Sequence, residues 1–231
     1  MAKSAASRSS IRERMREYYD RGGLAKKTRL LVSISVLTLL GKTKDLEDVF
    51  DWAIERRVSV NRIREAILQT MLFAGYPRAI HAFETLDGVL SRRGLKVKFR
   101  TDRLPPRSSS RPFFRRRGRE LFEEIYRGDT AAVTKRIAGF HPEFMDWILE
   151  DAYGQVLARP FLDLKTRELI AVALLAVLGL PRQLTPHMRG ALRAGARLRE
   201  VSETVRQQRL FLSKAAVEAA LIRLERANTT L

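Results

Sequence analysis

The sequence predicts an all-α protein that contains one helical module twice. Three observations predict this: apolar side chains recur at helical spacing, no segment sustains the apolar–polar alternation of a strand, and the chain resembles itself at an offset of 138 residues. Residues 27–73 and 165–211 align without a gap and share 13 identities in 47 positions. We therefore expect two tandem helical-bundle repeats joined by a linker.

Helical patterns fill the first repeat, which we place at residues 27–90. Gly41 follows a long apolar run and is expected to end a buried helix there, because glycine accepts the left-handed conformation of a helix C-terminus. Gly75-Tyr76-Pro77 breaks a later pattern into two helices. Counting a short amphipathic helix in the arm before the repeat, the expected helices lie at 12–19, 30–40, 46–54, 63–71 and 79–90.

The second half, residues 120–231, shows the same kind of periodicity. Thr185 and Pro186 fit the N-cap and first positions of a helix, so we expect one to begin there. The expected helices of this half lie at 120–126, 144–156, 166–178, 186–194, 198–211 and 214–227.

The net charge of +18 is concentrated outside the repeats. Residues 1–29 hold nine basic and three acidic side chains, and residues 91–119 hold twelve basic and one acidic side chain. Repulsion among like charges, together with Pro105-Pro106, predicts little regular structure between 91 and 119. We therefore assign residues 1–26 to a basic arm and residues 91–119 to an arginine-rich linker.

Two interpretations of the linker stay open. Arg115, Arg116 and Arg117 lie beside Phe113 and Phe114, and such interleaving suits phosphate contact with base stacking. The linker is then a binding site for nucleic acid or another polyanion, such as an anionic membrane surface. Alternatively, it is a connecting or assembly element that contacts a neighbouring subunit.

Composition excludes several kinds of chemistry. The chain has no cysteine, so disulfides and thiolate sites are impossible, and a reducing, cytoplasmic setting is expected. The apolar runs 30–40 and 169–180 are too short to span a bilayer. A transit peptide within residues 1–10 stays open. His81 and His141 are expected to be structural, and the three histidines form no metal-binding pattern.

The differences between the repeats indicate one polar site, a pocket in which two side chains should lie within hydrogen-bond reach, directly or through one water. The apolar side chains of the first repeat should fill the matching space there. Glu168 stands where the first repeat has Leu30, and His187 stands where it has Val49. In the expected first turn of its helix, His187 would be a neutral imidazole that can accept a proton. The alternative is that both side chains are structural, with Glu168 stabilised by the helix dipole.

Several motifs resemble the carboxymuconolactone decarboxylase family, which includes the alkylhydroperoxidase-D-like peroxidases. The resemblance covers both repeats and implies a helical module that forms homo-oligomers, a trimer of two-copy chains here, with sites near subunit interfaces. The motifs are Leu162-Asp163-Leu164-Lys165-Thr166-Arg167-Glu168, His187-Met188-Arg189-Gly190-Ala191-Leu192, Ile63-Arg64-Glu65-Ala66-Ile67-Leu68-Gln69-Thr70 and Ala74-Gly75-Tyr76-Pro77.

The resemblance also implies roles for residues. The two cysteines of the peroxidase branch fall on Leu180 and Gln183, which excludes thiol peroxidase activity. The decarboxylase branch implies cofactor-free acid/base chemistry on a small carboxylated or lactone substrate, with His187 transferring the proton and Glu168 orienting it.

Arg189 and Arg167 are candidate ligands for the substrate carboxylate, although Arg167 matches Arg29 and equally suits a structural ion pair. A non-catalytic scaffold subunit of a larger complex is the alternative function.

Overall fold

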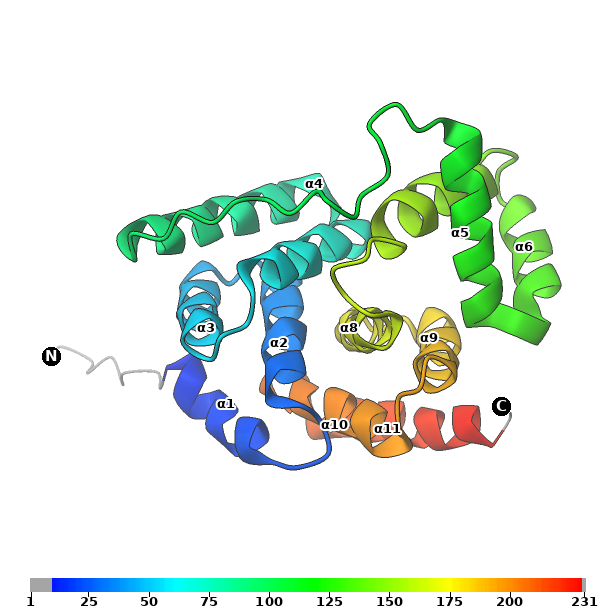
Figure 1. The fold of residues 1–231 in the computed structure, drawn as a ribbon. Helices are drawn as coiled ribbons and strands as arrows, with labels where there is room; N and C mark the ends of the chain where they lie inside the picture. Colours follow the sequence, from blue (N-terminus) through cyan, green and yellow to red (C-terminus); the bar gives the residue numbers. More distant parts are fainter. Residues whose placement is uncertain (1–9, 230–231) are drawn as a thin grey trace, which may run out of the picture.

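A computed structural model describes residues 10–229, and predictions for residues 1–9 lie outside this range. Every regular element of the described chain is a helix and none is a strand, which confirms the predicted class (Figure 1). Helix α1 (Ile11–Asp20) lies in the arm, and the first repeat contains α2 (Lys26–Leu40), α3 (Thr43–Glu55) and α4 (Val60–Arg92). The second contains α8 (Leu164–Val177), α9 (Pro181–Arg193), α10 (Leu198–Gln207), the short η3 (Gln208–Leu210) and α11 (Lys214–Asn228). Between them lie α5 (Arg111–Tyr126), η1 (Arg127–Asp129), α6 (Thr130–Ala138), α7 (Phe144–Trp147) and the π-helix η2 (Ile148–Leu157).

The helix boundaries of the first repeat follow its glycines. Gly41 ends α2 in the left-handed conformation, with φ of 64°, as predicted. The helices expected at 63–71 and 79–90 are the two segments of α4, which meet at a kink at Gly75, where φ is 76° and ψ is 170°. Pro77 follows this kink directly and sits at the start of the second segment, where its missing N–H costs no helical hydrogen bond.

The expectation of an irregular linker over 91–119 is wrong in its last third. Only residues 93–110 lack helix, and they run back along α4, where Arg64 donates hydrogen bonds to the carbonyl of Val97 (Figure 1). From Arg111 the chain is helical, because η2 supplies acceptors for the arginines of α5.

The helices α5 and η2 pack in close contact. Gly118 and Gly154 allow this approach, because a Cβ atom at either position would collide with the backbone carbonyl of Leu149 or Phe114. The aromatic side chains of the two helices form a small core of their own beside the repeats. The second half thus contains a helical subassembly that the first half lacks.

A buried ionic network ties the first repeat to the second. The guanidinium of Arg29, which is 0% exposed, donates to Glu203 Oε2 at 2.9 Å and to Gln207 Oε1 at 3.4 Å. It also donates to the backbone carbonyl of Arg21, whose own side chain forms a bidentate pair with Glu203.

The same network occurs with the repeats exchanged. Arg167 donates to Glu65 Oε2 at 3.0 Å, to Gln69 Oε1 at 3.3 Å and to the carbonyl of Arg159, whose side chain also pairs with Glu65. Each member differs by 138 positions from its counterpart in the first network. Reciprocal contacts of this kind are what a two-fold relation between the repeats requires.

One hydrophobic cluster spans both repeats, and a second lies mainly within the second repeat. Helices α2 and α8 pack side by side, and Ile170 and Leu174 of α8 belong to the same cluster as Leu30 and Leu37 of α2 (Figure 1). No helix within residues 10–229 is both long and apolar enough to cross a membrane.

Candidate functional site

Glu168 and His187 are in direct contact inside the second repeat. His187 Nδ1 lies 2.9 Å from Glu168 Oε2. Both are buried, with 1% of the Glu168 side chain and 11% of the His187 side chain exposed. Asp163 begins α8 by accepting a hydrogen bond from the backbone N–H of Thr166, which places Glu168 in the second turn facing α9.

The structure corrects the position of His187 within its helix. Helix α9 begins at Pro181 rather than at Pro186, which lies in the helix interior. The hydroxyl of Thr185 donates to the carbonyl of Pro181, so Thr185 is not the N-cap. His187 therefore lies in the second turn, where the dipole of the helix N-terminus has fallen off, and its orientation depends on Glu168 instead.

The first repeat fills the corresponding space with apolar side chains, as predicted. Leu30 and Val49 are both 0% exposed. A further difference, which the sequence analysis missed, is Gly190 at the position of Trp52. A Cβ atom on Gly190 would lie 2.5 Å from Glu168 Oε2, so the glycine makes room for the carboxylate.

Two tyrosines lie next to the pair. The ring of Tyr126, at the end of α5, packs edge-on against the imidazole of His187, with 6.4 Å between the ring centres and 71° between the planes. Its hydroxyl accepts a hydrogen bond from the hydroxyl of Tyr153 at 3.3 Å. Burial, reinforced by the negative charge of Glu168, raises the pKa of Tyr126 to about 12 and that of Tyr153 well above its ordinary value.

Comparison of the repeats carries a signal for one of these tyrosines. Tyr153 lies 138 positions after Met15 of α1, so extending the alignment of the repeats towards the N-terminus places this tyrosine opposite a methionine. Tyr126 lies in the segment between the repeats and has no counterpart from which it could be recognised.

The pair is enclosed, and this differs from the expected pocket. Ile125 and Tyr126 cover it, and the cavity of about 210 Å³ next to α9 is lined by Thr185, Arg189 and side chains of α11 instead. His187 Nε2 makes no hydrogen bond within residues 10–229, and 11% of the His187 side chain is exposed.

The two arginines proposed for substrate binding lie in different places. Arg167 is 1% exposed and belongs to the ionic network with Glu65. Of its two interpretations, the structural ion pair is therefore the one that its contacts support. The guanidinium of Arg189 lies 3.4 Å from Asp129 of η1, on the side of α9 that η1 and the end of α5 cover.

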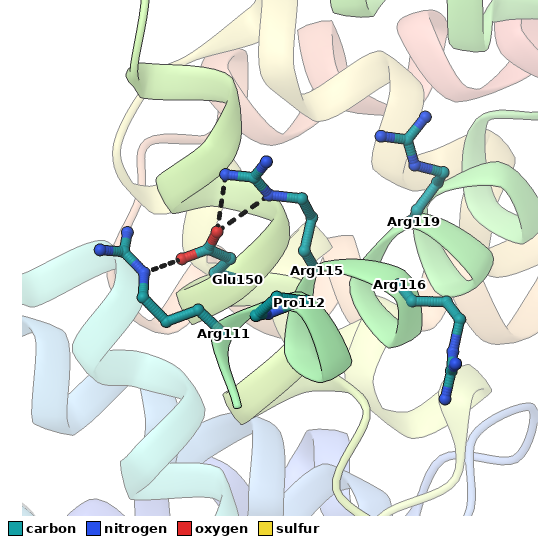
Figure 2. A pocket seen from close by; sticks show the side chains of 6 residues that line it. All are labelled: Arg111, Pro112, Arg115, Arg116, Arg119 and Glu150. Carbon is teal, nitrogen blue, oxygen red and sulfur yellow. Dashed lines mark hydrogen bonds and ion pairs between the residues drawn. The ribbon is translucent and has the colours of Figure 1, made fainter. Parts of the chain in front are cut away.

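The arginines of α5 are largely occupied within the chain. Figure 2 shows Arg111 and Arg115 converging on the buried Glu150, with Oε atoms 2.6 and 2.8 Å from their nitrogens. Although burial opposes it, these two guanidinium groups hold the pKa of Glu150 below its ordinary value. Arg116 and Arg119 point away from Glu150 and from each other (Figure 2).

Arg117 also has a structural role, since it donates to the carbonyls of Gly154 and Ala158 at the end of η2. Polyanion binding by Arg115, Arg116 and Arg117 stays a prediction. Replacing all three arginines would nevertheless disturb packing, because Arg115 and Arg117 both bond to η2. Arg116 and Arg119 are the cleaner pair for such a test.

The remaining histidines make local contacts. His81 Nε2 lies 2.8 Å from the hydroxyl of Thr43, and His141 stacks on Trp147 with 5.7 Å between ring centres. Within the described part of the chain, no group of three or more acidic or histidine side chains is placed to hold a metal ion.

The fold and the pair together define an all-helical protein with a polar site in one of its two related halves. The carboxymuconolactone decarboxylase family matches residues 8–87 and 142–226, and the chain belongs to this family. The 4-carboxymuconolactone decarboxylase of Acinetobacter baylyi is 32% identical over 82 residues. That alignment covers 36% of this chain and 61% of the relative.

Proposed function

We propose that the second repeat is an acid/base site that decarboxylates or isomerises a small carboxylated or lactone-type substrate. The observation that carries this proposal is the 2.9 Å contact between Glu168 and His187, with Leu30 and Val49 at the same positions of the first repeat. A pair needed only for packing would have no reason to differ from its apolar counterparts, which fold equally well.

The 2.9 Å contact supports different roles for the two side chains. An ionised carboxylate only accepts hydrogen bonds, so Glu168 accepts from Nδ1–H of His187 and fixes the tautomer that leaves Nε2 free. Nε2, the ring nitrogen that does not face Glu168, is the atom that exchanges a proton with substrate.

In decarboxylation, the bond between the substrate carbon and its carboxylate breaks, and CO₂ leaves. The electron pair stays on carbon, and the protonated Nε2 of His187 delivers a proton there. Glu168 stabilises the imidazolium that exists before this transfer. In isomerisation, Nε2 removes a proton from one carbon and returns it to another.

The substrate class rests on the family and on the activity that names the relative. Arg189 is the proposed partner of the substrate carboxylate, because it lies on the same helix as His187 and beside Asp129 of η1. The expected homo-oligomer and the cytoplasmic location stay predictions.

Release of CO₂ from 4-carboxymuconolactone and related lactone acids tests the proposal. We expect His187→Gln and Glu168→Gln to lower kcat/KM by about 10²- to 10⁴-fold, the range for losing an acid/base group. His81→Gln is the matched control, since His81 lies in the first repeat and its imidazole contacts the hydroxyl of Thr43.

Full kcat/KM in His187→Gln would contradict the proposal. So would inactivity of the folded wild-type protein on every substrate of this class, and a non-catalytic scaffold subunit would then be the better description.

A further inference from the structure

The chain between the two family-matched segments reaches the site. We call residues 88–141 the insert. Its helix α5 ends with Ile125 and Tyr126, which are 1% and 9% exposed. Ile125 packs against Gly190, next to Glu168, and Tyr126 packs against His187. A segment outside the repeated module therefore covers both members of the pair.

Helix α9 carries two adaptations to the insert. Gly190 leaves space for Ile125, because a Cβ atom there would lie 2.8 Å from Ile125 Cγ2. Arg193 donates to the carbonyls of Ile125 and Tyr126, both at 3.0 Å, and so caps the C-terminal end of α5 with a positive charge.

The first repeat has neither adaptation. Trp52 replaces the glycine, and Glu55 replaces the arginine and pairs with Arg12 of α1 instead. The glycine and the arginine thus occur in the repeat that contacts the insert and not in the other repeat.

The hydroxyl pair of Tyr126 and Tyr153 is polar but uncharged at neutral pH. It lies close enough to Glu168 for the carboxylate to affect both tyrosines. Neither hydroxyl is hydrogen-bonded to Glu168 or His187, so contact with the imidazole comes through the Tyr126 ring. Edge-to-face packing at this distance is a specific and favourable aromatic arrangement.

We propose that Tyr126 is a positioning residue for His187. Its ring fixes the plane of the imidazole and keeps water from the Nδ1–Glu168 hydrogen bond, so that Nε2 alone meets substrate. The consequence for activity rests on the proposed function, whereas the restraint on the imidazole does not. The insert is then part of the site and not only a connection between repeats.

Nuclear magnetic resonance on protein with ¹⁵N-labelled histidine tests the restraint directly. The Nδ1–H signal of His187 is assigned by its absence from the spectrum of His187→Gln. In the wild type this signal should lie downfield, and its proton should exchange slowly with water. Tyr126→Leu removes the ring and should abolish this signal. Tyr126→Phe keeps the ring and should retain it, as should Tyr76→Leu, a control at a side chain that is 69% exposed.

Activity supplies a second measurement. If the proposed function holds, Tyr126→Leu should lower kcat by roughly 10- to 100-fold through misplacement of the imidazole, with little change in KM. Tyr126→Phe should restore most of kcat.

An unchanged Nδ1–H signal in Tyr126→Leu would overturn the proposal, and so would rapid exchange of this proton in the wild type. The wild-type measurement can overturn the proposal even if Tyr126→Leu does not fold. Because the signal needs no substrate, absence of activity in every variant would count against the proposed function alone.

Discussion

The two repeats have kept the same contacts where they meet and diverged where their helices face inward. Arg29 and Arg167 make matching networks across the interface, with nitrogen–oxygen distances of 2.9 and 3.0 Å to their glutamates. At the positions of Leu30 and Val49, by contrast, the second repeat has a carboxylate and an imidazole. The comparison indicates that the networks hold the two repeats together, and it predicts that the fold does not need the Glu168–His187 pair.

The largest expected effect comes from breaking either network. Glu203→Ala leaves Arg29 buried without its carboxylate, and Glu65→Ala does the same to Arg167. Each should lower the free energy of unfolding by about 3–5 kcal/mol, measured by urea denaturation, because an uncompensated buried charge remains.

The matched control is Glu55→Ala, whose pair with Arg12 is 43% and 36% exposed and should contribute under about 1 kcal/mol. A large loss for one network and a negligible loss for the other would break the equivalence of the repeats.

A smaller effect is expected at the position where the second repeat has Gly190 and the first has the much larger Trp52. Gly190→Ala places a Cβ atom against Glu168 and Ile125, so it should destabilise the protein by about 1–3 kcal/mol in thermal or urea unfolding. Gly88→Ala in α4 meets only Arg92, at 3.7 Å, and should be neutral or stabilising by up to about 1 kcal/mol. If both variants changed the free energy of unfolding equally, the space that Gly190 leaves beside Glu168 would not matter for stability.

The smallest effect on stability should come from making the second repeat resemble the first. The double variant Glu168→Leu, His187→Val replaces a buried polar pair by the apolar side chains of the first repeat. We expect an unfolding free energy that is unchanged or higher by about 1 kcal/mol, because apolar replacement removes the desolvation cost of the pair.

Proton-transfer activity should be lost in the same variant. A marked loss of stability would instead show that the pair has become part of the structural core, contrary to the comparison of the repeats.

Much of the site could be predicted from sequence because it appears as a difference between the repeats. Glu168 and His187 were identified in this way, and their direct contact is confirmed. The roles of the two side chains stay a proposal. Tyr126 could not be found, since it lies 61 positions before His187, in a segment with no counterpart.

The helical class, the repeat and several helix ends could all be predicted from local sequence patterns. These depend on local physics: apolar periodicity of 3.6 residues, and glycines such as Gly41 and Gly75 that adopt positive φ. The start of α9 was ambiguous, because both Pro181 and Pro186 satisfy the local preference for a first helical residue.

The helix at the end of the linker and the ion pairs between the repeats depend on tertiary contacts instead. Repulsion among like charges predicted an irregular chain up to residue 119. Helix α5 forms nevertheless, because Glu150 neutralises two of its arginines and a carbonyl of η2 accepts a hydrogen bond from a third. Likewise, the pairing of Arg29 with Glu203 joins residues 174 positions apart. Such contacts depend on which surfaces meet after folding, and local sequence preferences carry no information about them.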